Sequence, residues 1–250
     1  MKNILLVFAL LSSIGCPAEQ LAVAAAADLN FAMKEIAQRY QQSTGNTLKL
    51  SFGSSGNFFV QIQNGAPFDL FFSADISYPA KLGQAGLAEP GTIYQYAVGK
   101  IVLWVPNNSQ LDLSKGIDVL LDPSIKKIAM ANATHAPYGR AAEEALKKAG
   151  IYDRVKGKLV IGENISQTAQ FVQTGNAEIG IIAESLAKAP TMAAEGRFVE
   201  ISSPLYSPID QGAVVLKNSP HKTAAKAFLA FMKTVEVQQI LTQYGFTIPK

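Results

Sequence analysis

The sequence has 250 residues, of which 48% are hydrophobic and 16% are charged, which indicates a folded protein with enough material for one large or two smaller domains and excludes a disordered chain. The net charge of +3 is small and no basic run is present, which excludes nucleic acid as a partner. With only two histidines and one cysteine, we expect no cofactor and no metal bonded directly to the protein.

Residues 1–18 have the pattern of a secretory signal peptide. A basic residue precedes an apolar run at 4–11, which is too short to span a bilayer, and small residues follow. Cleavage after Ala18 would release a soluble protein. The alternative is a lipoprotein signal that leaves Cys16 lipidated. Because Ser13 stands where that signal usually has leucine, we favour soluble export and exclude this segment from the fold.

The mature chain begins with an alternation of strand and helix patterns. A continuous apolar run at 21–27 is typical of a buried parallel strand, and further strands are expected at 48–52 and 69–72. Helical patterns follow each of them: from Asp28 to a stop at Gly45, at 58–62, and at 76–85. This order predicts a mostly parallel sheet with helices on both faces.

A second series begins near Gly99. Its expected strands are at 101–105, 127–130, 159–161 and 179–182, with helices at 140–149 and 167–173. An apolar strand at 209–216 and two further helices, the last at 237–244, complete the chain.

The two series predict two α/β lobes. Lobe 1 comprises 19–98 plus 212–250, lobe 2 comprises 99–211, and the hinge crossings lie near Gly99 and Asp210. Ligands of such folds bind at the carboxyl ends of the strands, which between two lobes means the cleft.

The stretch Gly53-Ser54-Ser55-Gly56 connects an expected strand to an expected helix. Glycine lets the backbone approach a ligand, serine adds O–H donors, and the start of a helix presents free N–H groups. These features together favour an anion site. Serine and glycine are also ordinary cap and turn residues, so this loop alone leaves both interpretations open.

Three more loops have the same character, and each precedes an expected helix. The four are Ala26-Ala27-Asp28, Gly53-Ser54-Ser55-Gly56, His135-Ala136-Pro137-Tyr138-Gly139 and Glu163-Asn164-Ile165-Ser166. Two belong to each expected lobe. A closed cleft would therefore surround an anion with neutral donors from both sides.

Three motifs carry a family resemblance: Ala25-Ala26-Ala27-Asp28-Leu29, Ser51-Phe52-Gly53-Ser54-Ser55, and the more specific Gly65-Ala66-Pro67-Phe68-Asp69-Leu70-Phe71-Phe72-Ser73-Ala74-Asp75. With the ending Tyr244-Gly245-Phe246, they resemble the periplasmic molybdate-binding proteins of ABC importers over about residues 21–249. The resemblance implies a monomeric periplasmic protein, not an enzyme, that closes on molybdate or tungstate and delivers it to a membrane permease.

The resemblance also implies that backbone amides and hydroxyls of the four loops hold the oxyanion, with no direct bond from the protein to the metal. Ser55 falls on the family's serine, and Tyr138 and Ile165 fall on positions that donate a backbone N–H. Ser54 and Asn164 stand in the same loops and complete the candidate set with Asp28.

Two positions depart from the family pattern. Asp28 stands where well-known members have a serine, and Ala183 where some have a tyrosine. Sulfate, phosphate and chromate therefore remain alternative ligands. We expect Asp28 to cap its own helix. It could instead pair with Arg140 across the cleft or accept a hydrogen bond from a protonated oxyanion.

A rival interpretation is a secreted hydrolase with Ser54 or Ser55 as nucleophile and His135 as base. Gly53-Ser54-Ser55-Gly56 lacks the spacing of the Gly-x-Ser-x-Gly elbow, so we favour the binding protein.

Overall fold

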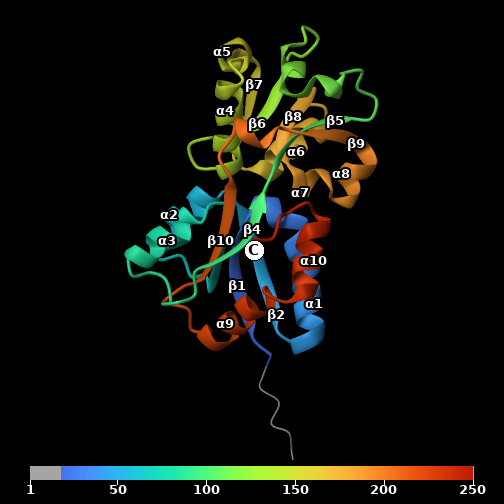
Figure 1. Cartoon of the computed structure of the whole chain (residues 1–250). Coiled ribbons are helices and arrows are strands. Elements are labelled where there is room, and N and C mark those ends of the chain that lie inside the picture. The colour runs from blue at the N-terminus through green and yellow to red at the C-terminus, as the bar shows by residue number, and fades with distance from the viewer. Residues whose placement is uncertain (1–17, 250) are drawn as a thin grey trace, which may run out of the picture.

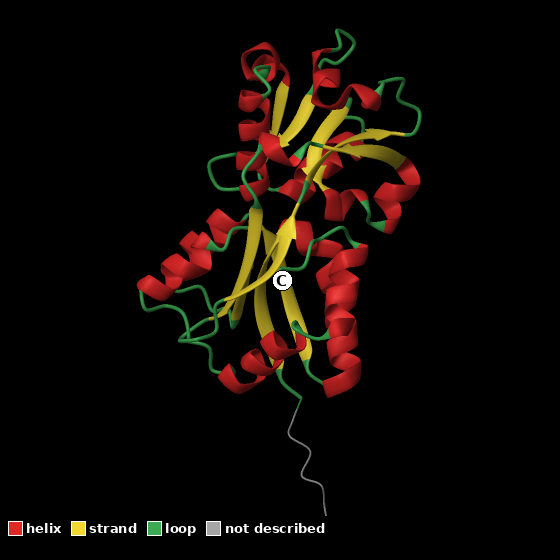
Figure 2. Cartoon of the chain, in the orientation of Figure 1, coloured by secondary structure: helices red, strands yellow, loops and turns green. Residues whose placement is uncertain are grey.

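The computed structural model describes residues 18–249 (Figure 1). The expected signal peptide, apart from Ala18, and the candidate lipidation site Cys16 lie outside the described residues. Within residues 18–249, no helix is long and apolar enough to cross a membrane. The described chain forms two lobes, each with a five-stranded sheet, and Figure 2 shows helices flanking both sheets.

The sheet of lobe 1 has the strand order β2-β1-β3-β10-β4. Its strands are β1 (Gln20–Ala26), β2 (Thr47–Gly53), β3 (Leu70–Ser73), β4 (Tyr94–Gly99) and β10 (Ile209–Val215). β1 pairs in parallel with β2 and β3, whereas β10 is antiparallel to β3 and β4. The predicted mostly parallel sheet is therefore confirmed, with β10 as the reversed strand.

Helices cover both faces of this sheet. They are α1 (Asn30–Thr44), α2 (Ser55–Gln63), α3 (Ser77–Gln84), α9 (Lys222–Phe231) and α10 (Val235–Gln243). Alternate residues of β1 separate the two faces: Val23 packs in a cluster with α1, α9 and α10, while Ala24 packs in a second cluster with α2 and α3. Gly45 ends α1 with φ of 77°, as its position in the sequence predicts.

The sheet of lobe 2 has the order β7-β6-β8-β5-β9. Its strands are β5 (Ile101–Pro106), β6 (Ile128–Ala131), β7 (Leu159–Gly162), β8 (Ile179–Ala183) and β9 (Gly196–Glu200). The helices of lobe 2 are α4 (Pro137–Lys148), α5 (Tyr152–Val155), α6 (Ile165–Gln173), α7 (Glu184–Ala187) and α8 (Pro190–Glu195). The 3₁₀ segment η1 (Ala27–Leu29) precedes α1 in lobe 1. Three other 3₁₀ segments, η2 (Leu113–Leu121), η3 (Lys156–Lys158) and η4 (Ser203–Leu205), lie between β5 and β10.

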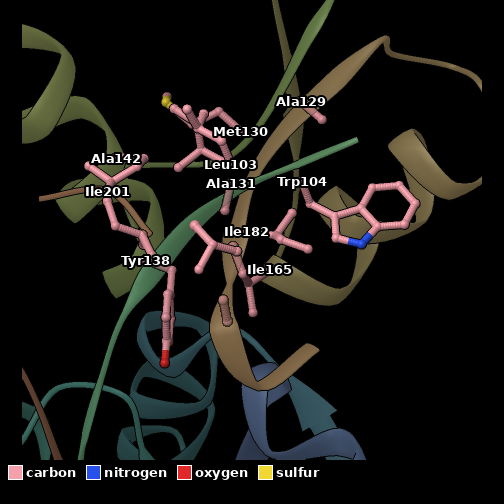
Figure 3. Close-up of a cluster of buried hydrophobic side chains, with 14 of the residues drawn as sticks. Leu103, Trp104, Ala129, Met130, Ala131, Tyr138, Ala142, Ile165, Ile182 and Ile201 are labelled. Atoms are coloured by element: carbon pink, nitrogen blue, oxygen red, sulfur yellow. The ribbon is translucent and has the colours of Figure 1, made fainter. Parts of the chain in front are cut away.

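The core of lobe 2 reaches the boundary between the lobes. Figure 3 shows Leu103, Trp104 and Ile182 in the buried cluster, with Tyr138 at its edge. The phenol oxygen of Tyr138 points out of this cluster toward elements of lobe 1 (Figure 3). Packing in lobe 2 thus holds a polar group against the other lobe.

The chain crosses between the lobes from β4 to β5 and from β9 to β10 (Figure 1). The sequence prediction assigns residues 209–211 to lobe 2, whereas the structure pairs Ile209, Asp210 and Gln211 with β4 of lobe 1. The polar residues Asp210 and Gln211 lie within β10 itself, so composition does not mark the boundary between the lobes. The hinge near Gly99 and Asp210 stays a prediction.

Candidate functional site

The four loops singled out in the sequence meet between the lobes. A small cavity of about 10 Å³ lies where they converge. Its lining residues are Ala26, Ala27, Asp28, Gly53, Ser54, Ser55, Ala74, Ala136, Pro137, Tyr138 and Ile165. No basic side chain is among them. The cavity is far smaller than the pockets of about 300–1,000 Å³ that hold drug-sized molecules, so the closed site has no room for a large organic ligand.

Three helices begin at this cavity: α2 from lobe 1, and α4 and α6 from lobe 2. First-turn N–H groups of a helix have no acceptor within the helix. Among residues 18–249, the backbone N–H groups of Ser55, Tyr138 and Ile165 donate to no protein acceptor. Free N–H groups and helix dipoles that converge in this way form a site for an anion.

Ser55 is fully buried at the first position of α2. Its Oγ accepts a hydrogen bond of 2.9 Å from the backbone N–H of Ala74. Because that bond uses a lone pair, the hydroxyl hydrogen is left to donate into the cavity. The structure thus keeps the predicted hydroxyl donor and adds a structural role that sequence reasoning did not foresee.

Ser54 bridges the lobes. As the cap of α2, its Oγ accepts from the N–H of Asn57 at 3.3 Å, and it lies 2.9 Å from Nδ1 of His135. His135 Nε2 is 3.4 Å from the carboxylate of Glu163. The groups that a serine hydrolase needs are therefore close together, but Glu163, which would orient His135, is two-thirds exposed and lies 3.4 Å away.

Close backbone contact accompanies this bridge. The N–H of Gly56 donates to the carbonyl of His135 at 2.9 Å, and a Cβ at Gly56 would lie only 2.7 Å from that oxygen. Glycine at this position is therefore required for the lobes to approach each other as they do.

Asp28 does not cap a helix, and that prediction is wrong. It lies inside η1, and no side chain caps either η1 or α1. Its carboxylate is 1% exposed, and Oδ2 accepts from Gln211 Nε2 at 2.6 Å and from the Tyr138 hydroxyl at 3.0 Å. Burial raises the pKa of Asp28 to about 6, although these two hydrogen bonds and the backbone N–H groups of Asp28 and Leu29 lower it.

Arg140 does not pair with Asp28. Its guanidinium forms a salt bridge with Asp75 and donates to the Tyr78 hydroxyl at 3.3 Å, both in lobe 1. Arg140 of α4 is therefore neither a solvated helix residue nor the counter-ion of Asp28. It links the lobes at the edge of the cleft.

Two more predicted positions do not line the cavity. Asn164 caps α6 by accepting from the N–H of Gln167 at 3.0 Å, and the residue that faces the cavity from this loop is Ile165. Ala183 is buried at the end of β8 and adds no polar group. Position 183 therefore lacks the hydroxyl donor that a tyrosine supplies in some family members.

Three polar residues hold the η1 loop; sequence reasoning placed Ser166 in a candidate loop without giving it a role and missed Ser185 and Gln211. Ser166 donates to the carbonyl of Ala27 and Ser185 to the carbonyl of Asp28, each at 2.8 Å. Gln211 contacts Asp28 from β10. A lone amide in the apolar run at 209–216 was the one signal that could have identified Gln211.

Two lobes joined by two crossings, closed on a small cavity lined by helix N-termini, define a solute-binding protein. The chain matches the family model described as bacterial extracellular solute-binding protein over residues 21–247, and it belongs to that family.

Several relatives have a stated ligand. The molybdate-binding protein ModA of Rhodobacter capsulatus is 41% identical over 95% of this chain and 93% of its own length. ModA of Azotobacter vinelandii is 38% identical over 93% of this chain and 92% of its own length.

Solved structures agree on the fold. The periplasmic molybdate-binding protein of Azotobacter vinelandii superposes with a TM-score of 0.87 at 31% identity, covering 92% of this chain and all of that one. The sulfate-binding protein SubI of Mycobacterium tuberculosis, with a TM-score of 0.73 at 19% identity over 91% of this chain and 86% of its own, shares the fold.

Proposed function

We propose that this protein captures molybdate or tungstate in the periplasm and delivers it to the membrane permease of an ABC importer. The observation that carries the proposal is the convergence of three free helix N-termini on one small cavity between the lobes. The relatives that are 41% and 38% identical to this chain are molybdate-binding proteins, which supports the choice of anion.

In the proposed complex, the N–H groups of Ser55, Tyr138 and Ile165 and the hydroxyl of Ser55 donate to the oxyanion's oxygen atoms. No protein atom bonds the metal. Because the donors are neutral and buried, each hydrogen bond to the charged oxygens is stronger than a bond between neutral groups. Ser54 and Asn164 contribute by capping α2 and α6, which fixes where the first-turn N–H groups point.

Contacts between the lobes supply the closing step. Ser54 with His135, Arg140 with Asp75, and Ser166 with the backbone of η1 all join opposite lobes. An anion that bonds to α2 and to α4 and α6 adds to these contacts only when the cleft is closed. We therefore propose that binding favours the closed state, the form presented to the permease.

Native mass spectrometry of the exported protein, purified without added ligand and then mixed with equimolar molybdate, tungstate, sulfate and phosphate, tests this proposal. We expect one molybdate or tungstate per monomer in preference to sulfate and phosphate. Uptake of sulfate or phosphate instead, or of none of the four anions, would overturn it. Labelling of Ser54 by a fluorophosphonate would favour the hydrolase.

A further inference from the structure

Asp28 sits at the end of a buried hydrogen-bond chain that fixes the role of each atom. The hydroxyl of Tyr96 in β4 donates to Oε1 of Gln211 at 2.6 Å, which sets the orientation of the amide. The Gln211 Nε2 then donates to Oδ2 of Asp28 at 2.6 Å and lies 2.9 Å from the Tyr138 oxygen. The Tyr138 hydroxyl donates to the same Oδ2.

Oδ2 of Asp28 therefore accepts two hydrogen bonds, from Gln211 and Tyr138, and has no lone pair left for a proton. Oδ1 is buried and has no hydrogen-bond partner of ordinary geometry among the described residues, while the backbone N–H groups of Asp28 and Leu29 lie near the carboxyl. Asp28 also lines the cavity of the candidate site. If the carboxyl carries a proton, the network places it on Oδ1, the oxygen left for the cavity.

We propose that this protein takes up one proton on Asp28 when it binds a fully deprotonated oxyanion such as molybdate, and that the neutral carboxyl donates through Oδ1–H to an oxygen of the anion. This inference rests on the proposed function. The proton comes from the solvent, the Asp28 carboxylate becomes a carboxylic acid, and no covalent bond to the anion forms.

The electrostatics of the closed cleft favour this arrangement. A carboxylate and a dianion in one small, dry cavity repel each other, and protonation removes the repulsion while adding a donor. Burial already raises the pKa of the Asp28 carboxyl to about 6, and a bound dianion acts in the same direction.

The other ionisable groups on elements around Asp28 are tyrosines or have partners of their own. They are Tyr96 of β4, Tyr138 of α4, Arg140 with Asp75, Glu184 of α7 with Lys100 and Lys188, Asp210 of β10 with Gln95, Lys34 of α1 over the rings of Phe31 and Phe52, and His135 beside Ser54. Among these, Tyr138 alone contacts the carboxyl directly, and burial and the charge of Asp28 hold the Tyr138 pKa well above its ordinary value, so it stays neutral.

Protonation of Asp28 bears on which anion the site accepts. Phosphate still carries a hydrogen near neutral pH and can donate it to an ionised Asp28, so its binding needs no proton from solvent. Molybdate carries none and needs the acid form. Raising the pH therefore weakens molybdate binding more than phosphate binding.

Titration calorimetry with sodium molybdate at pH 7.5, run in HEPES and in Tris, measures the proton directly because the two buffers differ in ionisation enthalpy. We expect uptake approaching one proton per molybdate bound. The dissociation constant should rise about tenfold for each pH unit between pH 7 and 9. Asp28→Asn, which keeps the shape and carries a permanent amide donor, should bind molybdate without proton uptake and without this pH dependence.

Asp153→Asn is the matched control, because Asp153 is an exposed carboxylate paired with Lys156 away from the cleft. It should retain the proton uptake of the parent protein. Uptake that persists in Asp28→Asn would belong to another group, such as His135, and would overturn the inference. Tight molybdate binding by the parent without proton uptake would overturn the inference and leave the proposed function standing. No molybdate binding at any pH would overturn both.

Discussion

Ser55→Ala should lower both the stability of the empty protein and its affinity for molybdate. The Ser55 hydroxyl accepts from the N–H of Ala74 inside lobe 1, so its removal leaves a buried donor without a partner. That costs about 1–3 kcal/mol of unfolding free energy. Loss of the hydrogen bond to the charged anion costs a further 1.5–3 kcal/mol or so, which corresponds to roughly 10- to 150-fold in the dissociation constant.

Urea unfolding of the ligand-free variant measures the first quantity and titration calorimetry with molybdate measures the second. Ser51→Ala is the control: Ser51 lies on β2, the strand before the loop, and its side chain makes no hydrogen bond among residues 18–249. The control should leave affinity unchanged. If Ser55→Ala loses stability but binds molybdate as tightly as the parent, its hydroxyl is not a ligand contact and the reasoning is wrong.

Three further predictions concern pH, closure and salt. The pKa of Asp28 is about 6 in the folded protein and 3.8 ordinarily, so the protein loses stability as the pH rises through this window. Asp28→Asn, which cannot ionise, should therefore be about 3 kcal/mol more stable than the parent at pH 8 and equally stable below pH 4. Urea unfolding at both pH values measures this difference. Gly56→Ala places a Cβ 2.7 Å from the His135 carbonyl and should weaken molybdate binding at least tenfold in calorimetry with little loss of stability, whereas unchanged affinity would mean that this contact does not limit closure. Sodium chloride should weaken binding only slightly, since the donors are buried and neutral; a steep loss with salt would indicate an exposed cationic site.

The fold was predictable because its signals are local. Apolar patterns predicted β1, β2, β3, β5 and β8, and the β-α alternation predicted the parallel pairing. β4 (Tyr94–Gly99) and β9 (Gly196–Glu200) were missed. Both are edge strands of mixed polarity, and their pairing is decided by the neighbouring strand rather than by their own pattern.

Helix starts were placed too late. The sequence predicts helices from 140 and 167, whereas α4 begins at Pro137 and α6 at Ile165. Proline suits the first helical position because its missing N–H has no acceptor there. These early starts matter, since they bring the free N–H groups of Tyr138 and Ile165 to the cavity.

The environment of Asp28 could not be predicted from sequence. Aspartate before a helical stripe is typical of a cap, and this local signal gave the wrong interpretation. The groups that bind its carboxylate, Tyr138 and Gln211, stand 110 and 183 positions away in the chain. Only the folded structure brings these groups together. Glycine at position 99 makes room for the Tyr138 hydroxyl, because a Cβ there would lie 2.1 Å from its oxygen.

A crystal structure of the protein with molybdate, with the metal located by anomalous scattering at the molybdenum edge, tests the central claim most directly. We predict one anomalous peak inside the cavity, with the anion's oxygens within hydrogen-bond distance of the N–H groups of Ser55, Tyr138 and Ile165. A peak elsewhere on the protein, or an empty cavity in crystals grown with excess molybdate, would contradict the account.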